Sequence, residues 1–222
     1  MTSEQNKFRV VDVEQGSSEW LSFREGRITG TKLGKLFAKS RDESEIYNTD
    51  KPLIGFYNLL AERLATGIGD DDDLGSTRER GRDLEPEAVE RAEKELGLKL
   101  KRGQVWESKD WHIASPDAWT ADGKTAVEIK CLSSANHLKA IIEDEMPKEY
   151  FAEYINYFIV NKNLETLYVF LYDNRFEFEK LQAHWWKLER EKYQYEIERL
   201  RDVADLANDK ANRLIERLLM EV

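Results

Sequence analysis

Residues 115–130 read Ser-Pro-Asp-Ala-Trp-Thr-Ala-Asp-Gly-Lys-Thr-Ala-Val-Glu-Ile-Lys, and this stretch decides the fold that we expect. Asp122-Gly123 is a favoured two-residue turn of a β-hairpin, because both central positions of that turn take positive φ. Pairing outward from the turn sets Asp117 opposite Glu128, with Cβ atoms about 4.5–5.5 Å apart. Successive strand residues point to opposite faces, so Glu128 and Lys130 share one face and the apolar residues between them take the other.

Two carboxylates and a lysine on one face of a hairpin suggest a metal site. Acids this close repel each other, and a divalent cation relieves that repulsion. Mg²⁺ prefers carboxylates, water and phosphate oxygens. The same register sets the hydroxyl of Ser115 opposite Lys130. A solvated surface hairpin is the alternative, because Glu-x-Lys alone is common; we favour the metal site because Pro116-Asp117, the matched turn and Glu-Ile-Lys occur together.

The composition is that of a globular protein. The chain has 222 residues, of which 41% are hydrophobic and 11% aromatic. No apolar run approaches the roughly 20 residues that cross a bilayer, and the first residues lack the features of a signal peptide. Cys131 is the only cysteine, which excludes an intrachain disulfide and cysteine-rich zinc or iron–sulfur sites. We therefore expect a cytoplasmic protein with no membrane partner.

The net charge of −10 argues mildly against a nucleic acid partner, although the distribution of charge matters more than its sum. The four consecutive aspartates of Gly69–Asp73 resemble a metal cluster, but we favour a solvated loop. Basic residues gather in three clusters: Arg24, Arg27, Lys32 and Lys35; Arg78, Arg80 and Arg82; and Lys99, Lys101 and Arg102.

Apolar periodicity predicts a mixed sheet flanked by helices, with the hairpin at its centre. We expect helices over residues 18–25, 28–39, 52–65, 80–97, 134–145 and 147–160, and strands over residues 99–108, 111–119, 125–131 and 164–172. Pro86 places Glu85 near the first turn or a kink of its helix.

Residues 178–220 are predicted to be helical, with an apolar seam at alternating spacings of four and three. This seam fits packing on the chain's own core, which we slightly favour, or contact with a partner. We expect a catalytic core over residues 1–176 and a C-terminal helical region over residues 177–222 that packs on the core or on a partner.

The order of helix and three strands, with Asp117, Glu128 and Lys130, resembles the PD-(D/E)xK nuclease superfamily. Further stretches are similar to the lambda-exonuclease-like (YqaJ) viral recombinase family. They are Trp-Leu-Ser-Phe-Arg-Glu-Gly-Arg-Ile-Thr-Gly-Thr over residues 20–31, Gly-x-x-x-Glu-Pro-Glu-Ala over residues 81–88 and Ala-Ser-Pro-Asp-Ala over residues 114–118. Together they are far more specific than the superfamily motif.

The resemblance implies an α/β, restriction-endonuclease-like fold: a mixed central β-sheet flanked by helices, with long C-terminal helices. It also implies an exonuclease that depends on Mg²⁺, with Mn²⁺ as a substitute, and that digests one strand of linear double-stranded DNA 5′→3′ from its ends. Such enzymes serve phage-type recombination, and ring-shaped trimers are known in the family. A single-strand annealing protein is the implied partner, and the implied location is the cytoplasm of a bacterial host, with a phage or prophage gene.

By this resemblance Asp117 and Glu128 bind the metal together with the main-chain carbonyl of Ile129. Glu85 completes the acidic set. Lys130 orients or activates the attacking water, and whether it acts as a base or as an electrostatic clamp stays open.

The resemblance also implies a site for the terminal 5′-phosphate. Arg24 matches the family's phosphate-binding arginine, Thr31 stands where serine is usual, and Ser115 matches a second phosphate-contacting serine. Glu153 replaces a usual glutamine, which keeps the geometry but adds negative charge near the scissile phosphate or binds a further metal. Leu132 replaces a frequent proline.

Two other functions remain open at this point. One is an endonuclease or nickase of the same fold, which would cut closed circular DNA. The other is a DNA-end-binding protein without turnover, which fits the acidic charge and the seam but leaves the acidic set unexplained.

Overall fold

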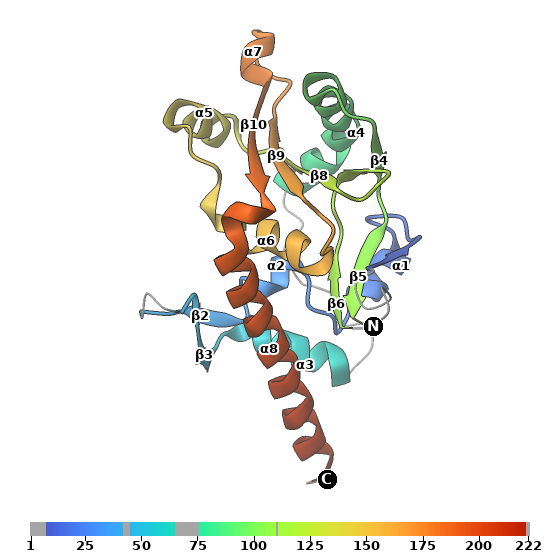
Figure 1. Cartoon of the computed structure of the whole chain (residues 1–222), viewed down its shortest axis with the longest axis vertical. Coiled ribbons are helices and arrows are strands. Elements are labelled where there is room, and N and C mark those ends of the chain that lie inside the picture. Colours follow the sequence, from blue (N-terminus) through green and yellow to red (C-terminus); the bar gives the residue numbers. More distant parts are fainter. Residues whose placement is uncertain (1–7, 42–44, 65–75, 110, 221–222) are drawn as a thin grey trace.

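The computed structural model describes residues 8–41, 45–64, 76–109 and 111–220 (Figure 1). The aspartates of Gly69–Asp73 lie outside the described residues. Among the described helices, none is both long enough and apolar enough to cross a membrane.

A five-stranded mixed sheet forms the centre, with strands in the order β10-β9-β8-β7-β4. These strands are β4 (Leu100–Arg102), β7 (Ala118–Thr120), β8 (Thr125–Lys130), β9 (Thr166–Tyr172) and β10 (Ala183–Glu189). Only β8 and β9 pair in parallel. A parallel pair needs a crossover connection, and here it contains α5 (Ser134–Glu143), the short helix η1 (Lys148–Tyr150) and α6 (Phe151–Val160). The predicted mixed sheet flanked by helices is confirmed.

A smaller sheet and a hairpin lie beside the central sheet. The smaller sheet has the order β1-β5-β6, from β1 (Arg9–Val11), β5 (Val105–Lys109) and β6 (His112–Ala114), and the hairpin pairs β2 (Phe37–Lys39) with β3 (Tyr47–Pro52). Two strands that we predict as continuous are therefore divided between the sheets. Gly103 and Gln104 have positive φ between β4 and β5, and Pro116, which cannot donate to a ladder, separates β6 from β7.

Several helix ends form where the sequence predicts them. The side chain of Ser17 caps α1 (Ser18–Arg24) by accepting from Trp20 N, and Ser133 caps α5 in the same way. Gly97 has a φ of 66° directly after α4 (Ser76–Leu96). Pro86 lies inside α4 rather than in its first turn, so Glu85 projects from the middle of a long helix.

Helices cover both faces of the central sheet. Helix α4 packs on one face, where Val89 and Ala92 lie in one cluster with Val127 and Ile129 of β8. Helix α6 covers the other face, and α8 (Gln194–Met220) packs against α6 (Figure 1). The alternation along β8 thus places Glu128 and Lys130 on one face, as predicted, and the structure turns this face toward α6.

The predicted helix over residues 28–39 is wrong beyond one turn. Helix α2 (Gly30–Leu33) ends at Gly34, and Phe37–Lys39 pairs with β3 instead. Residue propensity there is overridden by strand pairing. The sequence also predicts an apolar stripe of Leu53, Tyr57, Leu60 and Leu64 on the helix that is α3 (Ile54–Leu64), but only Leu60 of these four is buried. Phe56 and Leu59 are buried, whereas Tyr57 is exposed, because this helix has apolar residues on more than one face.

The prediction that residues 178–220 are helical throughout is wrong over β10. Helix α7 (Glu179–Gln182) has one turn, and all seven residues of β10 pair antiparallel with β9. The aromatic residues Trp185 and Trp186 favour a strand there. A short helix, η2 (Arg190–Tyr193), leads into α8. The division of the chain after residue 176 stays a prediction.

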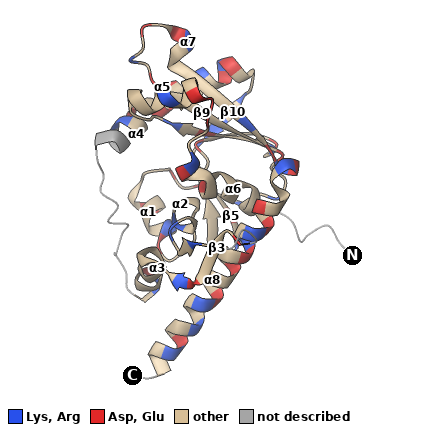
Figure 2. Cartoon of the chain, turned by 90° about the vertical axis from the view of Figure 1, so that its left-hand side faces the viewer, with Lys and Arg blue, Asp and Glu red and all other residues tan. Residues whose placement is uncertain are grey.

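Helix α8 packs on its own chain, as we slightly favour. Ile197, Leu200, Ala204, Ala207 and Ala211 of the predicted seam are buried, and α8 contacts α6, α3 and β3. Figure 2 shows charges of both signs along this helix. The described C-terminal end of α8 extends beyond the rest of the chain in Figure 1.

Candidate active site

The hairpin of β7 and β8 has the predicted register. Ala118 pairs with Val127 and Trp119 with Ala126, and one further step sets Asp117 opposite Glu128. The predicted two-residue turn is wrong in type. Residues 121–124 form a longer loop in which Gly123 has positive φ and Asp122 does not.

The loop keeps the register because it is centred on the predicted turn. Asp122 Oδ1 accepts from Thr120 Oγ1 at 2.6 Å and from Lys124 N at 3.0 Å, so one carboxylate joins both sides of the loop. Gly123 N donates to Thr120 O at 2.9 Å. The loop extends the predicted turn by one residue on each side, Ala121 and Lys124, and Asp117 and Glu128 therefore stay opposite each other.

Asp117 is buried where the ladder between β7 and β8 ends. Its Oδ2 accepts from Ile129 N at 2.7 Å, so the carboxylate takes the place of a main-chain acceptor. Its Oδ1 accepts from Gln15 Nε2 at 3.2 Å. Gln15 Oε1 is buried and has no hydrogen-bond partner within the described part of the chain. The amide of Gln15 is thus held beside Asp117 while its own oxygen can still accept a hydrogen bond.

Lys130 lies between two carboxylates that come from different elements. Its Nζ is 2.6 Å from Glu128 Oε1 and 2.8 Å from Glu153 Oε2 on α6. The hydroxyl of Tyr157, also on α6, donates to Glu128 Oε2. The ring of Tyr150 lies 4.2 Å from the Lys130 ammonium. The crossover helix therefore completes the polar face of β8.

The acids titrate in opposite directions. Burial raises the pKa of Asp117 to about 7, and the charge of Glu85 adds to this shift. Burial, with the Asp117 carboxylate next, raises the pKa of Glu128 well above its ordinary value. Burial also acts to raise the pKa of Glu153, but the ammonium of Lys130 outweighs it and lowers that pKa overall. Burial and neighbouring carboxylates thus disfavour the charged forms of Asp117 and Glu128, whereas Lys130 stabilises the charged form of Glu153.

The ammonium of Lys130 is stabilised by its neighbours. Burial acts to lower the pKa of Lys130, but Glu128 and Glu153 raise it well above its ordinary value. Glu85 lies farther out, with its Oε1 3.7 Å from Arg102 Nη2. Burial raises the pKa of Glu85 despite Arg102, and the charge of Glu128 raises it further. Glu85 therefore belongs to the same electrostatic group, although no hydrogen bond joins it to Asp117 or Glu128 in the described chain.

The three residues predicted to bind phosphate come together at a small cavity. Its volume is about 20 Å³. It is lined by Arg24, Thr29, Gly30, Thr31, Ala114, Ser115, Glu153, Asn156 and Tyr157. Thr31 Oγ1 donates to Glu153 Oε1 at 3.1 Å, and Trp20 Nε1 donates to Ser115 Oγ at 3.2 Å. Glu153 and Tyr157 line this cavity and also contact the acidic face, so the two predicted parts of the site adjoin.

Sequence reasoning missed Tyr157 and Gln15. Tyr157 follows Glu153 by four residues, a spacing that puts both side chains on one face of a helix, so the signal was present once Glu153 was singled out. Gln15 lies far from the hairpin in sequence and approaches it only through the tertiary fold. The Thr31 and Glu153 contact was likewise not predictable from spacing.

The donors at this site fit a hard divalent cation. Asp117 and Glu128 are 9% and 4% exposed, and each carboxylate has an oxygen lone pair beyond its present partners. Within the described ranges no group of three or more His, Cys, Asp and Glu side chains is arranged to hold a metal. Mg²⁺ needs no such cage, because it is usually held by one or two carboxylates together with water and phosphate oxygens.

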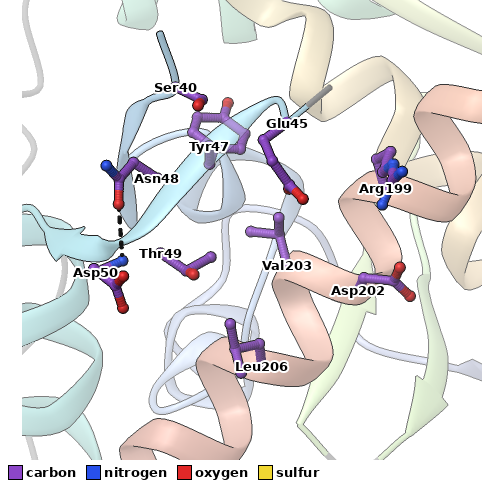
Figure 3. A pocket seen from close by; sticks show the side chains of 10 residues that line it. All are labelled: Ser40, Glu45, Tyr47, Asn48, Thr49, Asp50, Arg199, Asp202, Val203 and Leu206. Atoms are coloured by element: carbon purple, nitrogen blue, oxygen red, sulfur yellow. Dashed lines mark hydrogen bonds between the residues drawn. The ribbon is translucent and has the colours of Figure 1, made fainter. Parts of the chain in front are cut away.

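A larger pocket lies elsewhere and contains none of the predicted site residues (Figure 3). Its volume is about 460 Å³, and it opens between β3 and α8. It is lined by Ser40, Glu45, Tyr47, Asn48, Thr49, Asp50, Arg199, Asp202, Val203 and Leu206. Three acids against one arginine do not favour a phosphate ligand.

Comparisons with known proteins agree with the predicted family. The profile of the YqaJ-like viral recombinase domain matches residues 19–162. None of the curated proteins compared with the chain matches it in sequence.

Solved structures share the fold at low identity. The alkaline exonuclease LHK-Exo of Laribacter hongkongensis is 21% identical, with a TM-score of 0.76 over 92% of this chain and 97% of that one. Its complex with dAMP gives 20% identity and a TM-score of 0.72, over 93% and 100% of the two chains. A phage related exonuclease from Haemophilus somnus 129PT is 12% identical, with a TM-score of 0.62 over 86% and 96%. The domain match covers more than half of the chain, and the protein therefore belongs to the YqaJ-like viral recombinase domain family.

Proposed function

We propose that the protein is a DNA exonuclease that depends on a divalent metal and degrades one strand of linear double-stranded DNA 5′→3′ from its ends. The observation that carries the proposal is the junction of a buried acidic face with a cavity lined by Arg24, Thr31 and Ser115. Family membership and the exonucleases that share the fold support it. Mg²⁺ is the cation that we propose, with Mn²⁺ as a substitute.

Asp117 and Glu128 would hold this cation, with the main-chain carbonyl of Ile129 and with Glu85 near the outer side. When bound, such an ion polarises a phosphate oxygen and makes a bound water more acidic. Ile129 N donates to one carboxylate oxygen of Asp117 and Gln15 Nε2 donates to the other, so the carboxylate is oriented before any ligand binds. Such preorganisation favours the transition state, since no reorientation is needed at the moment of reaction.

Lys130 acts in this proposal as an electrostatic clamp on the attacked phosphate and on the attacking water. Its ammonium forms ion pairs with Glu128 on β8 and Glu153 on α6, and these two contacts hold the positive charge in a fixed position. Glu153 balances that charge when DNA is absent.

Arg24, Thr31 and Ser115 bind the terminal 5′-phosphate in this proposal. An arginine offers a planar fork that matches two phosphate oxygens. The guanidinium of Arg24 lies 4.2 Å from the ring of Trp20, which orients it. The Trp20 indole also donates to Ser115, so one aromatic side chain positions two of the three phosphate-binding groups.

Digestion of end-labelled linear duplexes tests the proposal. With Mg²⁺ or Mn²⁺ we expect release of labelled mononucleotide from the 5′ end first, and no release with EDTA. Lys130→Met should abolish release, whereas the exposed Lys124→Met, which loses only its contact with Glu165, should not. Absence of metal-dependent release, or full activity of Lys130→Met, would contradict the proposal. Cutting of closed circular DNA would instead indicate an endonuclease.

We also propose a homo-oligomer, a trimer by family resemblance, that works beside a single-strand annealing protein in the cytoplasm of a bacterial host. The exposed Leu218, Leu219 and Met220 at the end of α8 support an intermolecular contact. Light scattering of the whole chain and of Leu219→Glu tests the oligomer: a monomer in both proteins would contradict it. Deletion of residues 214–222 tests the partner, because we expect the shortened chain to lose co-purification with the annealing protein.

A further inference from the structure

We propose that the buried ion pair of Lys32 and Glu62 positions Arg24 against Thr31 for recognition of the DNA end, and that Arg63 links this pair to α8. The inference rests on the proposed function, in which Arg24 and Thr31 receive the terminal phosphate. Arg24 ends α1 and Thr31 lies in α2. The width of the phosphate cavity is therefore set by the five-residue connection between these helices.

The carboxylate of Glu62 binds groups at both ends of the connection between α1 and α2. Glu62 Oε2 accepts from Lys32 Nζ at 2.5 Å and from Gly26 N at 2.8 Å. Lys32 Nζ also donates to the main-chain carbonyl of Arg24 at 3.2 Å. Lys32 follows Thr31 directly, so its side chain ties the segment that carries Thr31 to the residue that carries the guanidinium.

The ion pair is costly for a purely structural contact. The side chains of Lys32 and Glu62 are only 10% and 3% exposed, and burying two charges removes favourable hydration. Apolar residues of similar volume fill such a space at lower cost. A buried pair whose donors and acceptors are satisfied does, however, fix one geometry. The three hydrogen bonds to Glu62 and Arg24 are of this kind.

Arg63 extends the contact to the C-terminal helix. Its Nε donates to Gly26 O at 2.9 Å, and its two terminal nitrogens donate to Asn208 Oδ1 and Asn212 Oδ1 of α8, each at 2.9 Å. Gly26 has a φ of 66°, and a Cβ there would lie 3.1 Å from Arg63 Cγ. The close approach explains why glycine stands at this turn. It also gives α8 a part in shaping the end-recognition site.

Binding of DNA ends measures this positioning without requiring catalysis. Fluorescent duplexes with a 5′-phosphate or a 5′-hydroxyl are titrated in EDTA, and the ratio of the two dissociation constants is compared between variants. We expect the full chain to prefer the phosphorylated end by about tenfold, because a charge-assisted arginine contact contributes roughly 1.5 kcal/mol or more. Lys32→Met and the milder Arg63→Lys should each reduce the ratio to below about threefold. Lys124→Met is the matched control and should keep the full ratio.

A double-mutant cycle separates positioning from general stability. In an Arg24→Gln background, Lys32→Met should leave the ratio unchanged, since it acts through Arg24. The inference would be overturned if folded Arg63→Lys kept the full preference for the phosphorylated end. It would also be overturned if the effects of Lys32→Met and Arg24→Gln on the ratio were additive, or if the unaltered chain bound both ends equally. The proposed nuclease activity is judged separately by digestion of DNA. A preference for the phosphorylated end without digestion would contradict the nuclease activity, whereas digestion without that preference would contradict the inference about positioning.

Discussion

The hydroxyl of Tyr157 on α6 donates a hydrogen bond to Glu128 on β8, and both side chains are buried. The same tyrosine lines the small cavity that Arg24 and Ser115 also line. One side chain thus contacts the acidic face and the cavity at once, and neither contact is visible in the hairpin sequence.

Replacing Tyr157 with phenylalanine should weaken metal binding by about tenfold, because a partner that orients a metal ligand typically contributes 10–100-fold to affinity. The ring stays, so packing is preserved. Titration calorimetry with Mn²⁺ measures the change. Tyr168→Phe, on the α4 face of β9, is the control and should bind Mn²⁺ normally. Equal affinities of Tyr157→Phe and the unaltered chain would show that Glu128 needs no such support.

Glu153→Gln restores the residue that is usual in the family and removes one negative charge between Lys130 and the cavity. We expect tighter DNA binding, with KM about three- to tenfold lower, since one source of repulsion toward phosphate is lost. Steady-state digestion at fixed ionic strength measures KM. Glu149→Gln, an exposed carboxylate in η1, should change KM little. A higher KM for Glu153→Gln would indicate instead that Glu153 itself binds a cation.

The stability of the metal-free protein should fall as pH rises from 4 to 7. Burial raises the pKa of Asp117 from 3.8 to about 7, so the folded chain holds a proton there that the unfolded chain releases at lower pH. The stabilisation is present below about pH 4 and is lost as pH approaches 7, at up to about 1.4 kcal/mol per pH unit.

Urea denaturation in EDTA at several pH values measures this effect, and Asp117→Asn should flatten the slope. Added Mn²⁺ should stabilise the protein increasingly as pH rises, because binding requires the ionised carboxylate. Identical slopes for Asp117→Asn and the unaltered chain would mean that Asp117 titrates normally.

Leu200→Ala on α8 should lower the free energy of unfolding by about 2–5 kcal/mol, the usual cost of a cavity in a packed core. Leu200 is fully buried, whereas Leu218 on the same helix is 45% exposed. Leu218→Ala should therefore change stability by less than about 0.5 kcal/mol in the monomer. Denaturation at two protein concentrations checks both values. A large, concentration-dependent loss for Leu218→Ala would place that residue in a subunit contact.

The central hairpin could be predicted because local rules determine it. The register of Trp119 with Ala126 follows from a chain reversal centred on Asp122-Gly123 and from strict alternation along a strand, although the turn itself is longer than predicted. The helix over Ser18–Arg24 and the left-handed residue Gly97 follow from capping rules. These features depend on neighbours in sequence, and they agree with the structure.

The errors have a different origin. The strand Ala183–Glu189 lies in a predicted helical region, and only its pairing with β9 decides its conformation. The same holds for Phe37–Lys39, which pairs with β3. Gln15 and Glu62 reach their partners across the tertiary fold, so their contacts with Asp117 and Lys32 could not be deduced from spacing.

The crossover between β8 and β9 has a consequence for how such proteins diversify. The parallel pair obliges the chain to travel over the sheet, and the helix that does so supplies Glu153 and Tyr157 from outside the hairpin. Under the proposed function, substitutions in α6 would change which polynucleotide terminus is accepted, while the metal-binding residues of β8 would stay the same. Grafting α6 from a relative onto this chain is therefore a direct route to altered substrate preference.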